Sequence, residues 1–181
     1  MQQVTVSLGS NIDPVRHIHL CLDALTARFG TLDISRVFES EPVGFDDNRN
    51  FYNLVVAFES DASPGELQAW AKRLEAKHGR RPDTPKFSPR ALDIDLLTVG
   101  TRCGVVEGVT LPRDEITRNA FVLQPLAELL PHEAHPVCGT SYATLWQHFD
   151  PGAQRLWPVD FTWRGRLISQ ADTPLSLAAA R

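Results

Sequence analysis

The sequence predicts an α+β fold, because strand-type and helix-type patterns follow one another in the order β-α-β-β-α-β over residues 1–99. The 181 residues are 43% hydrophobic and 22% charged, which is the composition of one compact domain with its own core. The cysteines Cys21, Cys103 and Cys138 are odd in number and form no CxxC pair. We therefore expect reduced thiols and a cytoplasmic protein.

The first strand and the first helix have the clearest patterns. Val4, Val6 and Leu8 alternate with polar residues at the period of a half-buried strand, which residues 9–11 are expected to end. Asp13 is the predicted N-cap of a helix over residues 14–29, with a proline at its first position and a glycine after its end. Apolar residues recur along it at helical spacing: Val15, Ile18, Leu22, Leu25 and Phe29.

The next three elements complete the first half of the pattern. Residues 32–37 predict a second strand, and a long polar connection over residues 40–50 follows it. Residues 51–58 read FYNLVVAF, which is typical of a central strand buried on both faces. Ser63 and Glu66 then form a capping box for a second helix that ends near residue 79.

The fourth strand of the pattern lies at residues 90–97, after a proline-rich stretch without periodicity over residues 79–89. This order is that of a ferredoxin-like sheet with both helices on one face and the other face open. Further along the chain we expect a hairpin over residues 101–112, helices over 120–130 and 142–149, and a hairpin across Gly165. Residues 1–150 then form the domain, and residues 151–181 a C-terminal extension with a frayed end.

Charge and motifs exclude several classes of function. The chain has 18 basic and 22 acidic residues, so its surface as a whole does not attract a polyanion, and nucleic acid is not an expected partner. No apolar stretch approaches the length of a membrane span. The sequence contains no GxxxxGK[ST] or GxGxxG loop, so P-loop nucleotide hydrolases and dinucleotide-binding proteins are disfavoured. Any nucleotide is therefore held by side chains.

Asp93 and Asp95 are the strongest candidates for chemistry. Two residues apart on a strand, they project from the same face with α-carbons roughly 6.6 Å apart, a spacing at which carboxylates can hold Mg²⁺ together with phosphate. The alternative is an ordinary polar face of an alternating strand. Basic residues lead directly into this strand and favour a shared metal and phosphate ligand: Lys77, Arg80, Arg81, Lys86 and Arg90.

Three other groups have both a functional and a structural interpretation. Asn53 interrupts an apolar strand, so its amide binds either a heterocycle or neighbouring backbone. Phe51 and Phe121 are able to stack on such a ring, although packing in the core is the simpler interpretation. An HxxHxxC array at residues 132–138 suggests zinc, but it contains two prolines and lacks a clear fourth ligand, so we do not expect a zinc site.

Residues 89–97, PRALDIDLL, resemble the signature of 6-hydroxymethyl-7,8-dihydropterin pyrophosphokinase, an enzyme family of folate synthesis. Other motifs fall in the family's order and spacing, namely VSLGSN at 6–11, SEPVG at 40–44, FYN at 51–53, Glu75 with GR at 79–80, LP at 111–112 and AFVL at 120–123. The resemblance covers roughly residues 3–149. It implies a ferredoxin-like core and transfer of the β,γ-pyrophosphate of ATP to the hydroxymethyl oxygen of the pterin, with release of AMP.

The resemblance also implies roles for individual residues. Asp93 and Asp95 would hold two Mg²⁺ ions and form the catalytic set with Arg80 and Arg90. The pterin would be bound by Ser40, Val43, Gly44, Phe51, Asn53 and Phe121. ATP, the co-substrate, would be bound by Glu75, Arg80, Phe87, Arg90, Leu96, Thr110 and Arg113. The expected partners are thus small molecules, with neither nucleic acid nor membrane, and we expect a monomer or a weak dimer.

Departures from the family pattern gather on the nucleotide side. Pro82 stands where a second arginine is usual, and Arg113 and Asp114 stand where a histidine and an aromatic or basic residue are typical. Phe87 and Asn119 also differ from the common residues. Two alternatives follow: a divergent paralogue that uses another pterin or phosphate donor, and a non-catalytic ferredoxin-like module that binds pterin.

Overall fold

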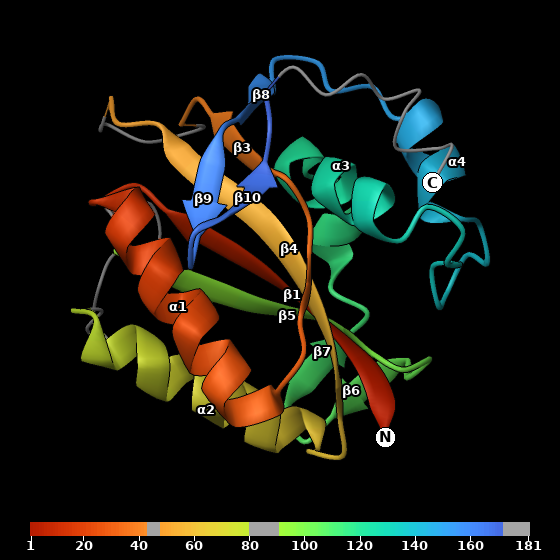
Figure 1. The fold of residues 1–181 in the computed structure, drawn as a ribbon. Helices are drawn as coiled ribbons and strands as arrows, with labels where there is room; N and C mark the ends of the chain where they lie inside the picture. The colour runs from red at the N-terminus through yellow and green to blue at the C-terminus, as the bar shows by residue number, and fades with distance from the viewer. Residues whose placement is uncertain (43–47, 80–90, 172–181) are drawn as a thin grey trace.

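A computed structural model describes residues 1–42, 48–79 and 91–171 of the chain (Figure 1). Within these residues a six-stranded sheet has the order β5-β1-β4-β3-β8, with the short β2 also paired to β4. Its antiparallel strands are β1 (Gln2–Ser10), β2 (Asp33–Ile34), β3 (Val37–Ser40), β4 (Phe51–Ser60), β5 (Asp93–Val99) and β8 (Leu156–Val159). The four predicted strands thus take the ferredoxin-like order, with the second predicted strand divided into β2 and β3.

Helices α1 (Pro14–Phe29) and α2 (Pro64–Lys77) cover one face of this sheet (Figure 1). Their apolar stripes join alternate residues of the central strands in the main core. The capping box of Ser63 and Glu66 is present as predicted. The predicted side-chain cap of α1 is wrong: Asp13 is in the left-handed region with φ 43°, and its side chain makes no capping hydrogen bond.

The opposite face is not open, contrary to expectation. Helix α3 (Ala120–Leu129) packs on β4 and β3 there, and α4 (Tyr142–Gln147) packs on α3. A second core cluster fills this layer: Val55, Leu97, Ile116, Val122, Leu123, Leu126, Ala127 and Tyr142. A 3-10 turn, η1 (Asp114–Thr117), leads into α3. The alternating faces of β4 are therefore both buried, because each has its own layer of helices.

Two hairpins lie outside the main sheet. The first, of β6 (Gly104–Val106) and β7 (Val109–Leu111), and the second, of β9 (Phe161–Trp163) and β10 (Arg166–Ser169), lie where the sequence predicts them. The second packs against α1, where Nε1 of Trp163 donates to Oδ1 of Asp23 at 3.0 Å. Its rings Phe161 and Trp163 extend the main core.

The C-terminal segment also supplies β8, which the sequence did not predict. β8 pairs with β3 over Val37–Ser40 and so covers that edge of the sheet. Among the described residues, no helix is both long enough and apolar enough to cross a bilayer.

Candidate active site

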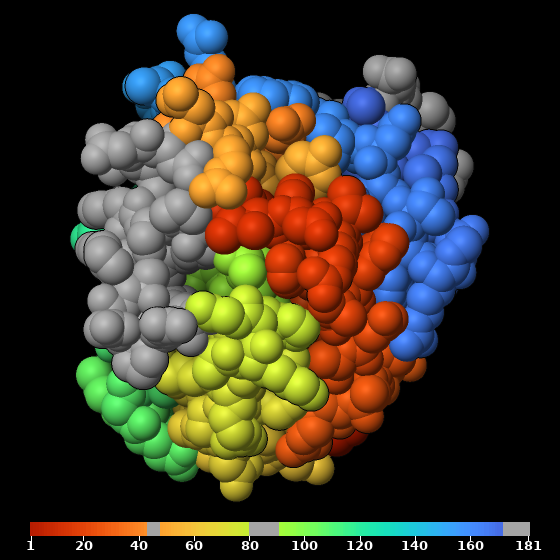
Figure 2. Space-filling model, turned by 90° about the vertical axis from the view of Figure 1, so that its left-hand side faces the viewer, coloured from red at the N-terminus to blue at the C-terminus, as the bar shows by residue number. Residues whose placement is uncertain are grey.

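The two candidate carboxylates lie on the same face of β5, as the alternation predicts. Ile94 and Leu96 point into the core beneath α1 and α2, which places Asp93 and Asp95 on the other face. Asp93 is opposite Gly9 in the sheet, and Asp95 is opposite Ser7. Figure 2 shows a hollow between the turn after β1 and the end of α2, with the segment around the start of β5 at its floor.

Glu75 fixes the start of β5 from the neighbouring helix. Glu75 is only 5% exposed, and its Oε1 accepts a hydrogen bond from the backbone N–H of Ile94 at 2.9 Å. Ile94 stands between the two aspartates, so this bond positions both of them. The structure thus gives Glu75 a positioning contact, and its contact with ATP stays a prediction.

Asp95 is held in an environment that disfavours its charge. Burial is the main cause, the nearby charge of Asp93 adds to it, and together they raise the pKa of Asp95 to about 7. The guanidinium of Arg113 opposes this effect, with Nη2 of Arg113 at 3.4 Å from Oδ1 of Asp95. A carboxylate under this strain is stabilised by any further cation that binds beside it.

We expect the pKa of Asp95 to make the metal-free protein less stable as pH rises. A carboxyl whose pKa is raised on folding stabilises the folded state below its unfolded pKa, near 4, and this contribution is lost as pH rises through about 7. Asp95→Asn keeps the side chain neutral, so the variant should exceed the wild type in free energy of unfolding by on the order of 1–3 kcal/mol at pH 8. At pH 5 the two proteins should be similar.

Denaturant unfolding in the presence of a chelator at both pH values measures this difference. An equal change in stability at pH 5 and pH 8 would show that the carboxyl of Asp95 titrates normally.

Arg113 lies beside the carboxylates because the chain after β7 returns to β5. Its backbone N–H donates to the carbonyl of Leu97 at 2.9 Å, and its Nη2 donates to Oε1 of Glu115 at 2.9 Å. Nε of Arg113 is buried and has no hydrogen-bond partner among the described residues. A partly exposed guanidinium next to two carboxylates suits a phosphate group that is bound together with a metal. Sequence reasoning missed Glu115, which holds this arginine.

The other residues expected to bind ATP lie in different surroundings. Thr110 is exposed on β7, in the hairpin that precedes Arg113. The side chain of Leu96 is 3% exposed and lies in the main core, on the opposite face of β5 from Asp95. Only its main chain therefore remains for a contact on the side of the carboxylates. Arg80, Phe87 and Arg90 lie outside the described residues.

Asn53 lies on the same face as the carboxylates, two strands away from β5. Gly9 on β1 is opposite Asn53 on one side and opposite Asp93 on the other, so the three residues form a row across the sheet with Gly9 in the middle. Nδ2 of Asn53 donates to Oγ of Ser40 at 2.8 Å and to the carbonyl of Phe38 at 3.3 Å. Both amide hydrogens are thus in use, and the carbonyl oxygen of Asn53 faces the space beside Gly9. The structure therefore shows the backbone contact that the sequence left open, and it leaves an acceptor for a ligand.

The two expected stacking residues are partly buried near this row. Phe51 is opposite Ser40 in the sheet, and Phe121 lies in the first turn of α3 at the margin of the second core cluster. The side chains of both retain exposed surface. Val43 and Gly44, which complete the expected pterin set, lie outside the described residues.

The donors present suit Mg²⁺ bound jointly with phosphate. Asp93 and Asp95 offer hard oxygen ligands on one face, while no group of three or more His, Cys, Asp and Glu side chains placed to hold a metal occurs in the described ranges. Two carboxylates leave most positions of an octahedral ion to water and phosphate, which is how Mg²⁺ is usually held. In the HxxHxxC segment, Nδ1 of His135 accepts a hydrogen bond from the backbone N–H of Val137 at 3.2 Å, so this ring nitrogen has a structural role within its own loop.

Fold and site together define a ferredoxin-like α+β protein with a carboxylate pair beside an arginine on one sheet face, and a buried amide two strands away on the same face. The family model of 7,8-dihydro-6-hydroxymethylpterin-pyrophosphokinase matches residues 5–131. The chain belongs to this family.

Individual relatives agree with this assignment. The chain is 34% identical over 134 residues to the 2-amino-4-hydroxy-6-hydroxymethyldihydropteridine pyrophosphokinase of Pseudomonas aeruginosa, a match that covers 72% of this chain and 82% of that one. The enzyme of the same name from Aquifex aeolicus is 30% identical over 138 residues, covering 76% and 86% of the two chains. The folic acid synthesis protein fol1 of Pneumocystis carinii is 30% identical over 150 residues, which are 81% of this chain and only 20% of that protein.

Solved structures show the same fold. An HPPK-DHPS in complex with substrates aligns with a TM-score of 0.71 at 9% identity, covering 95% of this chain and 48% of that one. Wild-type HPPK-DHPS of Plasmodium falciparum aligns with a TM-score of 0.67 at 12% identity, covering 95% and 50%. The chain thus spans about half the length of these two-part proteins and a fifth of the fungal protein.

Proposed function

We propose that this chain transfers the β,γ-pyrophosphate of ATP to the hydroxymethyl oxygen of 6-hydroxymethyl-7,8-dihydropterin, with AMP as the second product. The family match and the named activity of the bacterial relatives support this reaction. None of the relatives reported above has a name that supports a different pterin, a different phosphate donor or a non-catalytic role. The single observation that carries the proposal is the carboxylate pair on one face of β5 beside Arg113, in a member of this family.

Asp93 and Asp95 are the residues that would hold Mg²⁺, two ions in our proposal. The bound metal supplies positive charge that neutralises the phosphate oxygens during transfer. The remaining work of this chain is positioning, because phosphoryl transfer needs in-line alignment of the reactants more than covalent chemistry.

In this proposal the two reactants occupy adjacent positions of one sheet face. Arg113, whose Nη2 lies 3.4 Å from Oδ1 of Asp95, would pair with phosphate, and Glu115 keeps its guanidinium oriented. Asn53 accepts from the polar edge of the pterin, with Ser40 holding the amide in this orientation. Phe51 and Phe121 provide ring faces for stacking. Gly9, between Asp93 and Asn53, lacks a side chain that would separate the two subsites.

AMP release is the direct test of this function. We expect AMP and the pterin diphosphate to appear only when ATP, Mg²⁺ and the hydroxymethyl pterin are all present. Mass spectrometry of the products and omission of each component in turn make the measurement specific. Binding of the pterin without AMP release under these conditions would overturn the proposal and favour a binding module.

A further inference from the structure

The C-terminal segment of residues 154–170 lies wholly beyond the family match, which ends at residue 131. It is nevertheless attached to both structures that flank the proposed pterin subsite, β3 and α3. β3 carries Ser40 and pairs with β4 beside Asn53, whereas α3 carries Phe121 in its first turn. The attachment occurs at two ends of the space between β3 and α3.

At the end nearer Ser40, residues 154–156 join the two elements. The carbonyl of Arg155 accepts from the backbone N–H of Glu41 at 3.3 Å, and Leu156 is opposite Ser40 in the sheet. The side chain of Gln154 reaches the other way. Its Oε1 accepts from the backbone N–H of Ala120 at 2.7 Å, and its Nε2 donates to the carbonyl of Arg118 at 3.1 Å.

Gln154 thus serves as a cap that α3 does not provide for itself. The residue at the N-cap position, Asn119, makes no capping bond with its own side chain. The first backbone N–H groups of a helix need an acceptor, and here Gln154 supplies one from a distance of 34 residues in the sequence. Ala120 directly precedes Phe121, so this bond fixes the backbone from which the stacking ring projects.

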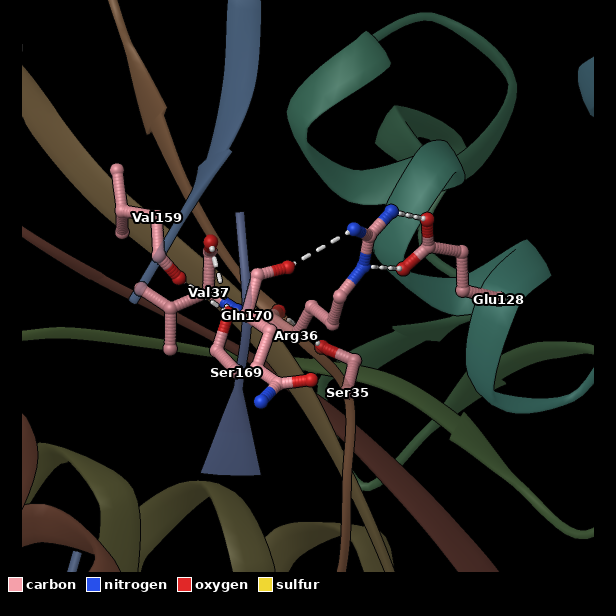
Figure 3. Close-up of polar contacts among 7 residues, drawn as sticks. All are labelled: Ser35, Arg36, Val37, Glu128, Val159, Ser169 and Gln170. Carbon is pink, nitrogen blue, oxygen red and sulfur yellow. Dashed lines mark hydrogen bonds and ion pairs between the residues drawn. The ribbon is translucent and has the colours of Figure 1, made fainter. Parts of the chain in front are cut away.

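The far end of the same space is fastened as well (Figure 3). Arg36, just before β3, pairs with the carboxylate of Glu128 near the end of α3, and its Nη1 donates to the carbonyl of Gln170 at 3.2 Å. Oγ of Ser169 accepts from the N–H of Val37 at 2.9 Å. Both ends of α3 are therefore connected to β3. Among the described C-terminal residues, Gln154 alone has a side chain that hydrogen-bonds to the first turn of α3, which carries Phe121.

We propose that Gln154 is a positioning residue for the pterin subsite, which sets the place of Phe121 relative to Ser40 and Asn53. The inference depends on the proposed function, because the ring to be stacked is the pterin. Gln154 does not touch the reacting groups in this proposal. It acts through the first turn of α3, so it should affect pterin binding and leave the subsite of Asp93, Asp95 and Arg113 unaltered.

Three variants of Gln154 separate positioning from general stability. Gln154→Leu keeps most of the volume and removes both hydrogen bonds. Gln154→Glu keeps the acceptor for the N–H of Ala120, in a charge state that a helix N-terminus favours. Gln147→Ala, an exposed glutamine on α4, is the matched control. The dissociation constants of the pterin and of a nonhydrolysable Mg–ATP analogue are measured by calorimetry, together with KM for each substrate and the thermal midpoint.

For Gln154→Leu we expect a pterin dissociation constant raised about tenfold, because the first turn of α3 would be less ordered in the free protein and would have to be ordered when the pterin binds. The nucleotide constant should stay within about twofold, and Gln154→Glu should recover most of the pterin affinity. Unchanged pterin binding in folded Gln154→Leu would overturn the inference, as would an equal loss for both ligands. If Gln154→Leu fails to fold, the test rests on Gln154→Glu alone. A pterin affinity equal to that of the wild type in Gln154→Glu then supports the proposal, and a tenfold loss of pterin affinity refutes it.

These outcomes are distinct from failure of the proposed function. A wild-type protein that neither binds the pterin nor releases AMP would refute the function itself. A wild-type protein that does both, with a Gln154→Leu variant that binds pterin equally well, would refute only the role of Gln154.

Discussion

Replacing Asp95 with alanine is expected to lower turnover by at least about 100-fold while the protein remains folded. The carboxylate lies beside Asp93 on the face of β5 where we place Mg²⁺ and the triphosphate, and its charge is already balanced in part by Arg113. Without it, Arg113 keeps only its ion pair with Glu115, and the metal loses a ligand. Folding should not suffer, because the pKa of Asp95 is raised by burial, which means that its charge costs stability.

The measurement is kcat at saturating ATP and pterin, with circular dichroism and the thermal midpoint as evidence of folding. Asp33→Ala, which removes an exposed carboxylate from β2, serves as the control and should retain wild-type turnover. Wild-type turnover in folded Asp95→Ala would remove the carboxylate pair from the mechanism.

Replacing Asn53 with alanine is expected to raise the pterin dissociation constant by about 10- to 100-fold, the cost of one or two hydrogen bonds in a buried site. Both amide hydrogens are taken by Ser40 and Phe38, so the loss falls on the carbonyl oxygen that faces Gly9. Pterins carry N–H donors on the edge that such an acceptor recognises. Affinity for Mg–ATP should change little, because Asn53 is on β4, two strands from β5.

Ser40→Ala provides a graded comparison for this prediction. It removes one of the two acceptors that orient the Asn53 amide, so the loss of pterin affinity should be smaller than in Asn53→Ala. Calorimetric titration with the pterin measures both variants, and Gln147→Ala again serves as the control. Equal pterin affinity in Asn53→Ala and wild type would place the pterin elsewhere on the protein.

Local patterns in the sequence were enough to predict the central sheet and its first layer. β1, β4 and β5 alternate or run apolar, and α1 and α2 have stripes with clear ends, so each was predictable from its own residues. The same alternation predicted that Asp93 and Asp95 share a face. The resemblance then linked these elements to motifs distant in the sequence.

Features that depend on contacts between distant segments were not predictable in this way. β8 reads LWPV, with a proline and no alternation, and forms a strand because β3 offers it an unpaired edge. The pairing of Arg113 with Asp95 requires the chain to return past β5 after β7, which no local pattern encodes. The missing cap at Asp13 has a similar cause, since its left-handed backbone depends on the turn out of β1.

The place of β8 in the sheet has a consequence for where this chain can be cut or joined to another. Ending the polypeptide at residue 131, where the family match ends, or at residue 150 would leave the main-chain groups of β3 without their partners on β8. An unpaired edge strand of this kind can form backbone hydrogen bonds with other polypeptides and so promote aggregation. A tether to a further domain would therefore be best tolerated beyond Ser169, where β10 is complete.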